Sequence, residues 1–216
     1  MITIENVDVF GFEAAIRGMR NPLNSWDKSD SGYVTEYDEG GFDAEFYKIG
    51  DNDLALMKSL VKAGSDHSKF MRMINVTLDI TAPLYWWKEF DTYKVGTVRN
   101  SCSTMHKIHE KEFTLDDFSH EHLLECGFNN CLLYVIQCLN NWRERYLETK
   151  DKCFWWQMIQ LLPSSYNQRA TVQFNYAVLM NMYHSRKNHK LDEWREFCKW
   201  IESLPYSELI TGGERK

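Results

Sequence analysis

The segment from Met71 to Pro83, MRMINVTLDITAP, restricts the possible folds more than any other part of the chain. Every second residue in its centre is aliphatic: Ile74, Val76, Leu78 and Ile80. Such alternation indicates a strand with one buried face and one polar face, and the proline ends it. The patterns on both sides of this segment have helical spacing, so the sequence predicts an α+β protein built around a central sheet.

Further elements follow from periodicity and from turn residues. A strand is predicted over Ile2–Phe10, and a polar loop over Asn21–Gly32. Val95–Thr104 has no regular pattern and is predicted to be irregular. Helical spacing predicts helices over these ranges: Glu13–Met19, Asp51–Gly64, Leu84–Lys94 and a long helix Glu121–Leu147. Two or three more helices complete the chain. No repeat or low-complexity linker interrupts it, so we expect residues 1–216 to form a single domain.

Composition excludes several classes of protein. The chain has 216 residues, 44% of them hydrophobic, which is enough to bury a full core. Its net charge is −6 and its basic residues are dispersed, which argues against a nucleic-acid polymer as partner. No apolar run reaches the roughly 18–20 residues of a membrane span, and the first residues do not resemble a signal peptide. We therefore expect no membrane partner and a cytoplasmic location, with reduced cysteines that lack paired spacing.

Few short motifs suggest chemistry. His106 and His109 with Glu110, like His120 with His122, have spacings that occur often by chance, so we expect no metal site. No glycine-rich phosphate loop is present, so any phosphate would have to be bound by arginines and helix ends.

Cys102 lies in the polar segment NSCST, within ten residues of Lys94 and Arg99. Nearby cations can lower the pKa of a thiol. A plain loop cysteine is the more common alternative, and both interpretations stay open.

The stretch Leu161–Arg186 raises a specific question. Its spacing predicts a helix, but Asn175 and Arg186 fall on the apolar stripe, where burial is expected. A buried amide or guanidinium without a partner costs about 1–3 kcal/mol or more. Each of these side chains therefore needs a partner, either in the chain or on a ligand.

The same stretch resembles the C-terminal part of the flavin-dependent thymidylate synthases. Leu162-Pro163, Arg169, Asn175, the run Leu179–Asn181 and Arg186 follow one another at similar spacing. Three further segments, FEAAIRGM, GSDHSKF and MINVTLDITAPLYWWKEF, resemble earlier parts of that family in the same order. The resemblance covers most of the chain through scattered identities. It implies the fold of that family and a homotetramer with sites between subunits.

The chain departs from the family at its signature, which is Arg-His-Arg, seven residues and then Ser. Thr92, Tyr93, Lys94 and Cys102 occupy those positions here. The Arg-Gln pair that precedes the signature falls on Lys88-Glu89, the Asn-Glu within it on Arg99-Asn100, and a later Arg on Thr104. Arg195 lies one position out of register with the family's closing motif. Only basic character at Lys94 is retained.

The resemblance implies a function and two groups of site residues. The function is methyl transfer to dUMP or a related pyrimidine deoxynucleotide, with FAD as cofactor and a folate as one-carbon donor. The positions that match the family's nucleotide-binding residues are Lys88, Cys102, Arg169 and Arg195. Those that match its cofactor-binding residues are His67, Lys94, Asn175 and Arg186. No residue is assigned a catalytic role.

Two other interpretations stay open. One is a catalytically silent descendant that binds a nucleotide or only a protein partner. In either case, an alternative to ligand binding is that Asn175, Asn181 and Arg186 pair with Asp192, Glu193 or backbone carbonyls at an oligomer interface. The other is an unrelated structural protein.

Overall fold

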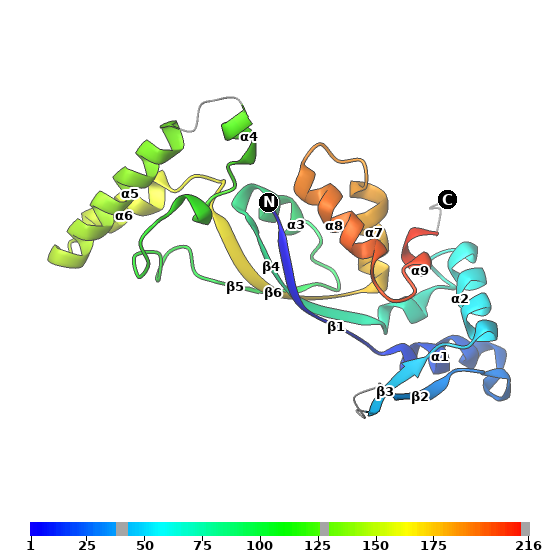
Figure 1. Ribbon diagram of the computed structural model, residues 1–216. Coiled ribbons are helices and arrows are strands. Elements are labelled where there is room, and N and C mark those ends of the chain that lie inside the picture. Colours follow the sequence, from blue (N-terminus) through cyan, green and yellow to red (C-terminus); the bar gives the residue numbers. More distant parts are fainter. Residues whose placement is uncertain (38–42, 126–129, 213–216) are drawn as a thin grey trace. The chain divides into compact units, whose positions relative to one another are not determined.

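The computed structural model describes residues 1–37, 43–125 and 130–212 (Figure 1). The predicted α+β class is confirmed. The strands are β1 (Thr3–Phe10), β2 (Gly32–Tyr37), β3 (Asp43–Lys48), β4 (Asn75–Pro83), β5 (Val98–Ser101) and β6 (Asn167–Asn175). The helices are α1 (Phe12–Arg20), α2 (Asp51–Ala63), α3 (Leu84–Phe90), α4 (Glu121–Glu125), α5 (Asn130–Thr149), α6 (Lys152–Leu161), α7 (Tyr176–Arg186), α8 (Asp192–Glu202) and α9 (Glu208–Thr211). Within the described ranges, no helix is both long and apolar enough to cross a membrane.

Four strands form a sheet in the order β1-β4-β6-β5. The predicted alternation of β4 is confirmed, since its aliphatic residues are buried and its polar residues are partly exposed. β6 alternates in the same way, with Gln168, Ala170, Val172 and Phe174 buried. Each of these two strands therefore contributes one buried and one polar face.

The prediction of one helix over Leu161–Arg186 is wrong in its first half. After the end of α6, residues 167–175 form strand β6, and only then does α7 begin. The segment NQRATVQFN has period-two alternation and β-branched residues at Thr171 and Val172, both typical of strands. Val172 and Phe174 therefore lie on a strand, and Asn175 stands at the junction with the helix.

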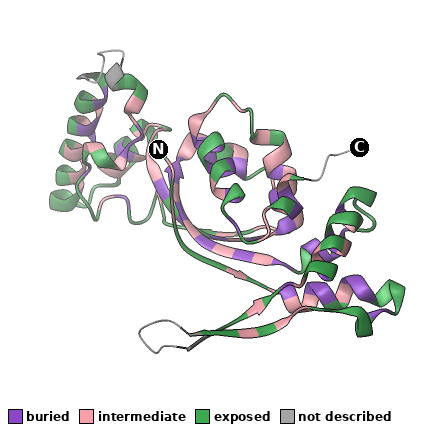
Figure 2. Ribbon diagram, turned by 45° about the vertical axis from the view of Figure 1, so that its right-hand side comes forward, coloured by how far each residue is buried: buried purple, intermediate pink, exposed green. Residues whose placement is uncertain are grey.

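Other predicted boundaries shift as well. The segment predicted to be irregular contains β5, and the loop Asn21–Gly32 contains two short 3-10 helices. The predicted long helix Glu121–Leu147 includes residues 126–129, which lie outside the described ranges; α4 and α5 cover the remainder. The antiparallel hairpin β2–β3, which places Val34 opposite Phe46, had no counterpart among the predicted elements. It is largely exposed (Figure 2).

The chain divides into two compact units, which are described separately. The first comprises Met1–Glu5, Asp79–Thr92 and Arg99–Val172. In it α5 packs along α6 (Figure 1). The hydrophobic cluster of these helices and the preceding loop is made of Ile108, Phe113, Phe118, Leu132, Ile136, Leu139 and Met158. A single domain over residues 1–216 remains a prediction.

The second unit comprises Asn6–Leu78, Tyr93–Val98 and Gln173–Lys216. Helix α7 is at its centre and packs against α8 and α9. Leu179, Met182 and Trp194 are fully buried there. Tyr176, in the first turn of α7, donates its hydroxyl hydrogen to the carbonyl of Pro205 at 2.5 Å, and burial raises the pKa of this tyrosine. α7 therefore has a fixed position within this unit.

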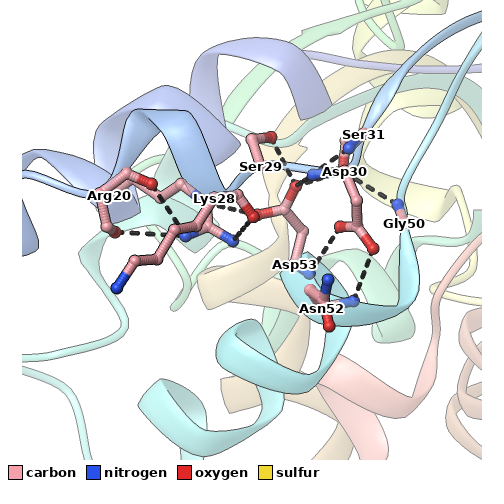
Figure 3. A network of polar contacts seen from close by, with 9 residues as sticks. Arg20, Lys28, Ser29, Asp30, Ser31, Gly50, Asn52 and Asp53 are labelled. Carbon is pink, nitrogen blue, oxygen red and sulfur yellow. Dashed lines mark hydrogen bonds and ion pairs between the residues drawn. The ribbon is translucent and has the colours of Figure 1, made fainter.

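Arg20, at the end of α1, forms a buried ion pair in the second unit (Figure 3). Its Nε donates to Oδ1 of Asp53 at 2.6 Å, and the two side chains are 5% and 0% exposed. The other guanidinium nitrogens donate to the carbonyls of Ser25 and Lys28, both at 3.0 Å. The arginine thus ties the loop after α1 to helix α2.

The second oxygen of Asp53 is also fully engaged. It accepts hydrogen bonds from the hydroxyls of Ser29 and Ser31 at 2.6 Å and from the amides of Asp30 and Ser31 at 3.2 Å. Burial alone would raise the pKa of Asp53, but the hydrogen bonds from Ser29, Ser31 and Arg20 and the charge of Arg20 together lower it below its usual value.

This pKa shift predicts a loss of stability in acid. The pKa of Asp53 is lower in the folded state than in the unfolded chain, where it is about 3.9. The ionised carboxylate therefore makes its full contribution to the free energy of unfolding above about pH 3.9. It should disappear as pH falls from about 4 through the folded-state pKa. Urea unfolding at several pH values would measure this loss. Asp53→Asn is the control, since its free energy of unfolding should fall less steeply below about pH 4; equal pH dependence in both proteins would contradict the assignment.

Candidate functional site

The second unit contains a cavity of about 880 Å³, which we call the α2–α7 cavity. Its walls come from four segments: the end of α2 with the following loop (Val61–Ser68), Arg72, Val95–Gly96, and the start of α7 from Asn175 to Asn181. This volume lies within the range of small-molecule sites, about 300–1,000 Å³.

Two helix ends shape this cavity. α2 stops at Gly64, and α7 begins after Asn175, whose side-chain oxygen accepts a hydrogen bond from the amide of Val178 at 3.1 Å. This N-cap satisfies one of the amides that a helix leaves unpaired at its start. The amide of Tyr176 donates to the carbonyl of Ile74, directly before β4, at 3.0 Å. The wall formed by α7 is therefore attached to the sheet.

The polar lining suits an anionic ligand with a hydrogen-bonding ring. Lys62 and Arg72 bring positive charge, and Asp66 brings one negative charge. His67 adds an imidazole. Asn175 and Asn181 add amides, which carry both donors and acceptors. Cations of this kind attract phosphate, and amides can recognise the edge of a pyrimidine-like ring.

The loop after α3 approaches α7 very closely at Gly96. This glycine has a φ of +77°, and a Cβ there would lie 3.1 Å from Nδ2 of Asn175 and 3.1 Å from a methyl group of Val178. Both contacts are tight, and residues that carry a Cβ rarely adopt this backbone conformation. A residue without a side chain therefore lets the loop lie against the cavity's helical wall.

Comparisons with known proteins agree on one fold. No family model and no curated protein sequence matches the chain. A crystal structure of flavin-dependent thymidylate synthase ThyX from Helicobacter pylori, complexed with FAD and dUMP, matches with a TM-score of 0.69 at 17% identity, covering 98% of this chain and 99% of that one. The chain has the fold of the flavin-dependent thymidylate synthases.

Two further matches show the same fold. A second structure of the Helicobacter pylori enzyme with FAD and dUMP has a TM-score of 0.68 at 17% identity, over 97% of this chain and 96% of that one. The UMP/dUMP methylase PolB from Streptomyces cacaoi, bound with 5-Br dUMP, has a TM-score of 0.67 at 14% identity, over 98% and 95%. The thymidylate synthase fold therefore spans nearly the whole chain.

On this thymidylate synthase fold, the α2–α7 cavity brings together two of the four predicted cofactor-binding residues. His67 and Asn175 both line it, and Lys94 directly precedes the lining residue Val95. Arg186 is not among the lining residues. Its Nε donates to the hydroxyl of Tyr93 at 2.9 Å, so the question raised by this arginine is answered by a partner within the chain.

Two of the predicted nucleotide-binding residues, Cys102 and Arg169, are neighbours in the first unit. The amide of Cys102 donates to the carbonyl of Arg169 at 2.9 Å. The guanidinium of Arg169 lies 2.8 Å from Asp79 and 3.7 Å from Glu5. The hydrogen bond that Arg169 donates to Asp79, and then the charge of Asp79, raise the pKa of this arginine. Its positive charge is thus already balanced by carboxylates.

The other two predicted nucleotide-binding residues lie elsewhere in the chain. Lys88 is exposed on α3 of the first unit. Arg195 belongs to α8 of the second unit, where it pairs with Asp192 and donates to the carbonyls of His189 and Lys190 at 2.8 and 3.1 Å. Arg195 thus closes the turn before α8. The structure does not gather the four predicted nucleotide-binding residues into one site within either unit.

Arg99, which was expected near Cys102, has other partners. Its guanidinium donates to both carboxylate oxygens of Asp91 at 2.8 Å and to the side chain of Gln168 at 2.5 Å, and lies 3.9 Å from the ring centre of Trp87. Gln168 in turn donates to the carbonyl of Cys102 at 2.6 Å. The guanidinium of Arg99 is therefore engaged by Asp91 and Gln168.

Sequence reasoning missed Lys62, Arg72, Gly96 and Asn181 as lining residues. Lys62 and Arg72 flank the segment GSDHSKF, which carried part of the family resemblance, and this proximity was the available signal. Among the described residues, no three His, Cys, Asp or Glu side chains gather as a metal site requires.

Proposed function

We propose that the protein is of the thymidylate synthase type. In this proposal it binds a flavin nucleotide in the α2–α7 cavity, and it also binds a pyrimidine deoxynucleotide of the dUMP class. The observation that carries this proposal is the meeting of His67 and Asn175 with Lys62 and Arg72 in one cavity. The Helicobacter pylori structures with the same fold are complexed with FAD and dUMP, which supports the same classes of ligand here.

The lining residues fit a flavin nucleotide. FAD carries a negatively charged diphosphate, which Lys62 and Arg72 can bind, and a ring system with alternating N–H and C=O groups. The oxygen of Asn175 is engaged by the amide of Val178, so this residue offers its NH₂ group to a ring carbonyl. A bound flavin would supply hydride-transfer chemistry; the chain's own part is to bind the phosphates and to orient the ring.

A specific observation favours binding without the parental reaction as a second candidate function. Tyr93, at the centre of the family's signature position, packs edge-on against buried Trp194 with ring centres 6.0 Å apart, and accepts a hydrogen bond from Arg186. Arg169 is balanced by Asp79 and Glu5. These residues are engaged by partners within this chain, which favours binding of the two nucleotides without methyl transfer from a folate to dUMP.

A homotetramer remains part of the proposal, and it rests on the resemblance alone. The side chains of Asn175 and Arg186 do not require an oligomer interface, since Asn175 caps α7 and Arg186 binds Tyr93 within one chain.

Titration with FAD, followed by flavin fluorescence and by absorbance between 350 and 500 nm, tests the proposal. We expect wild-type protein to bind FAD, and the double variant Lys62→Ala/Arg72→Ala to bind about tenfold more weakly. Two exposed cations facing a phosphate contribute together about 1–2 kcal/mol, and 1.4 kcal/mol is tenfold in affinity.

The matched control is Arg17→Ala/Lys58→Ala, which removes the same charge from cations of the same unit that do not line the cavity. It should bind FAD as wild type does. Wild-type protein that binds neither FAD nor dUMP at up to about 1 mM would remove the proposed function. Binding of both, with no methylation of dUMP when reduced flavin and a folate donor are added, would support the second candidate.

A further inference from the structure

The segment Tyr93–Gly96 contacts α7 near both ends of that helix. At one end, the hydroxyl of Tyr93 accepts a hydrogen bond from Nε of Arg186, in the last turn of α7. At the other end, Gly96 lies against Asn175 and Val178 in the first turn. The two residues between these contacts, Lys94 and Val95, are exposed. The segment is therefore hydrogen-bonded to α7 at Tyr93, lies close against it at Gly96 and is exposed in between.

The Tyr93 contact is a packed cluster as well as a hydrogen bond. The guanidinium carbon of Arg186 lies 4.9 Å from the ring centre of Trp194 and 5.6 Å from that of Tyr93. Trp194 is fully buried in α8. A guanidinium at these distances is attracted to the faces of aromatic rings, most strongly where water is excluded. Three elements, the loop, α7 and α8, thus meet at Arg186.

The open middle of the segment belongs to the α2–α7 cavity. Val95 and Gly96 both line it, and Val95 is 90% exposed, so its side chain has little packing of its own to hold it. Its contacts with α7 at Tyr93 and Gly96 then contribute to the position of this wall. Tyr93 and Arg186 are not among the lining residues, yet they supply one of these contacts.

We infer that Tyr93 and Arg186 are positioning residues, which seat the segment Tyr93–Gly96 as a wall of the α2–α7 cavity without touching its ligand. The inference rests on the proposed function in one respect, which is the identity of the ligand that this wall faces. If the ligand binds only when the wall is seated, its apparent dissociation constant equals the intrinsic constant divided by the seated fraction. Release of the Tyr93 attachment therefore weakens binding through the wall.

Trypsin reports on this attachment directly, because the exposed Lys94 lies in the segment. Cleavage of the Lys94–Val95 bond requires the segment to leave its seat, and its rate follows the population of the open form. In Tyr93→Phe, which keeps the ring and removes the hydroxyl, we expect this bond to be cut at least about tenfold faster than in wild type. Mass spectrometry of the fragments measures the rate at this bond alone.

The same variant should bind FAD about tenfold more weakly, corresponding to a seated fraction of about one tenth. Saturating FAD should slow the cut after Lys94 in wild type. Tyr183→Phe is the matched control, because it removes a tyrosine hydroxyl on α7 that donates to Glu202 at 2.8 Å and that does not line the cavity. It should leave both the cleavage rate and the affinity for FAD unchanged.

Equal cleavage after Lys94 in wild type and Tyr93→Phe would overturn the role of this attachment. Faster cleavage with unchanged FAD affinity would overturn the role of the segment as a wall. Wild-type protein that binds no FAD would overturn the flavin part of the proposed function, whereas the cleavage rates without ligand would still decide whether Tyr93 and Arg186 seat the segment.

Discussion

Asp53→Asn is expected to lower the free energy of unfolding by about 3–5 kcal/mol, the range found when one partner of a buried ion pair is removed. Asparagine has nearly the shape of aspartate, but it leaves the charge of Arg20 uncompensated in a site where that side chain is 5% exposed. It also places an NH₂ group where Ser29 and Ser31 donate hydrogen bonds to a carboxylate oxygen. Urea unfolding at pH 7 measures the change.

The control for this prediction is an exposed ion pair of the same unit. Lys58 and Glu208 lie 3.3 Å apart, with side chains 50% and 45% exposed. Glu208→Gln should change the free energy of unfolding by less than about 1 kcal/mol, because solvent screens such pairs. A similar small change for Asp53→Asn would show that water reaches Arg20 and Asp53 in solution.

Gly96→Val is expected to weaken FAD binding by about 10- to 100-fold. A β-branched residue at φ +77° costs about 1–3 kcal/mol of backbone strain, and the new side chain also begins 3.1 Å from Asn175 and Val178. If the segment escapes this strain by leaving its seat, each 1.4 kcal/mol of strain lowers the ratio of seated to open protein tenfold, and binding weakens as the seated fraction falls. Fluorescence titration with FAD measures the affinity.

Gly32→Val is the control for this substitution. Gly32 has an ordinary φ at the start of β2, and nothing lies within 4 Å of a Cβ placed there. It should bind FAD with wild-type affinity. Wild-type affinity in Gly96→Val as well would mean that the cavity accepts its ligand with this wall displaced.

Local patterns predicted much of the fold because they need no information from distant residues. The alternation of Ile74, Val76 and Leu78 sufficed to place β4, and the acidic start and glycine stop sufficed for α2. β6 was missed because its residues were fitted to a helical period that suits only the following α7. The local signal of this boundary was Asn175, an N-cap residue type, which was instead assigned to the apolar stripe of a longer helix.

The candidate site was harder to predict, since the role of an arginine depends on partners far away in sequence. Arg169 pairs with Asp79, 90 residues distant, and Arg186 with Tyr93, 93 residues distant. No spacing rule connects such residues. His67 and Asn175, in contrast, both line the α2–α7 cavity, and their role in binding a cofactor stays a prediction.

The two roles of Asn175 affect which residues can show whether descendants of this protein still bind the ligand. One side chain both begins α7, through Val178, and lines the α2–α7 cavity. Loss of an asparagine N-cap costs about 0.5–2 kcal/mol, which is enough for selection to retain it for folding alone. A descendant that had abandoned its ligand would still keep this asparagine. Lys62 and Arg72 are exposed, so in such a descendant they would be free to change. Their presence is therefore the better indication that the ligand is still bound.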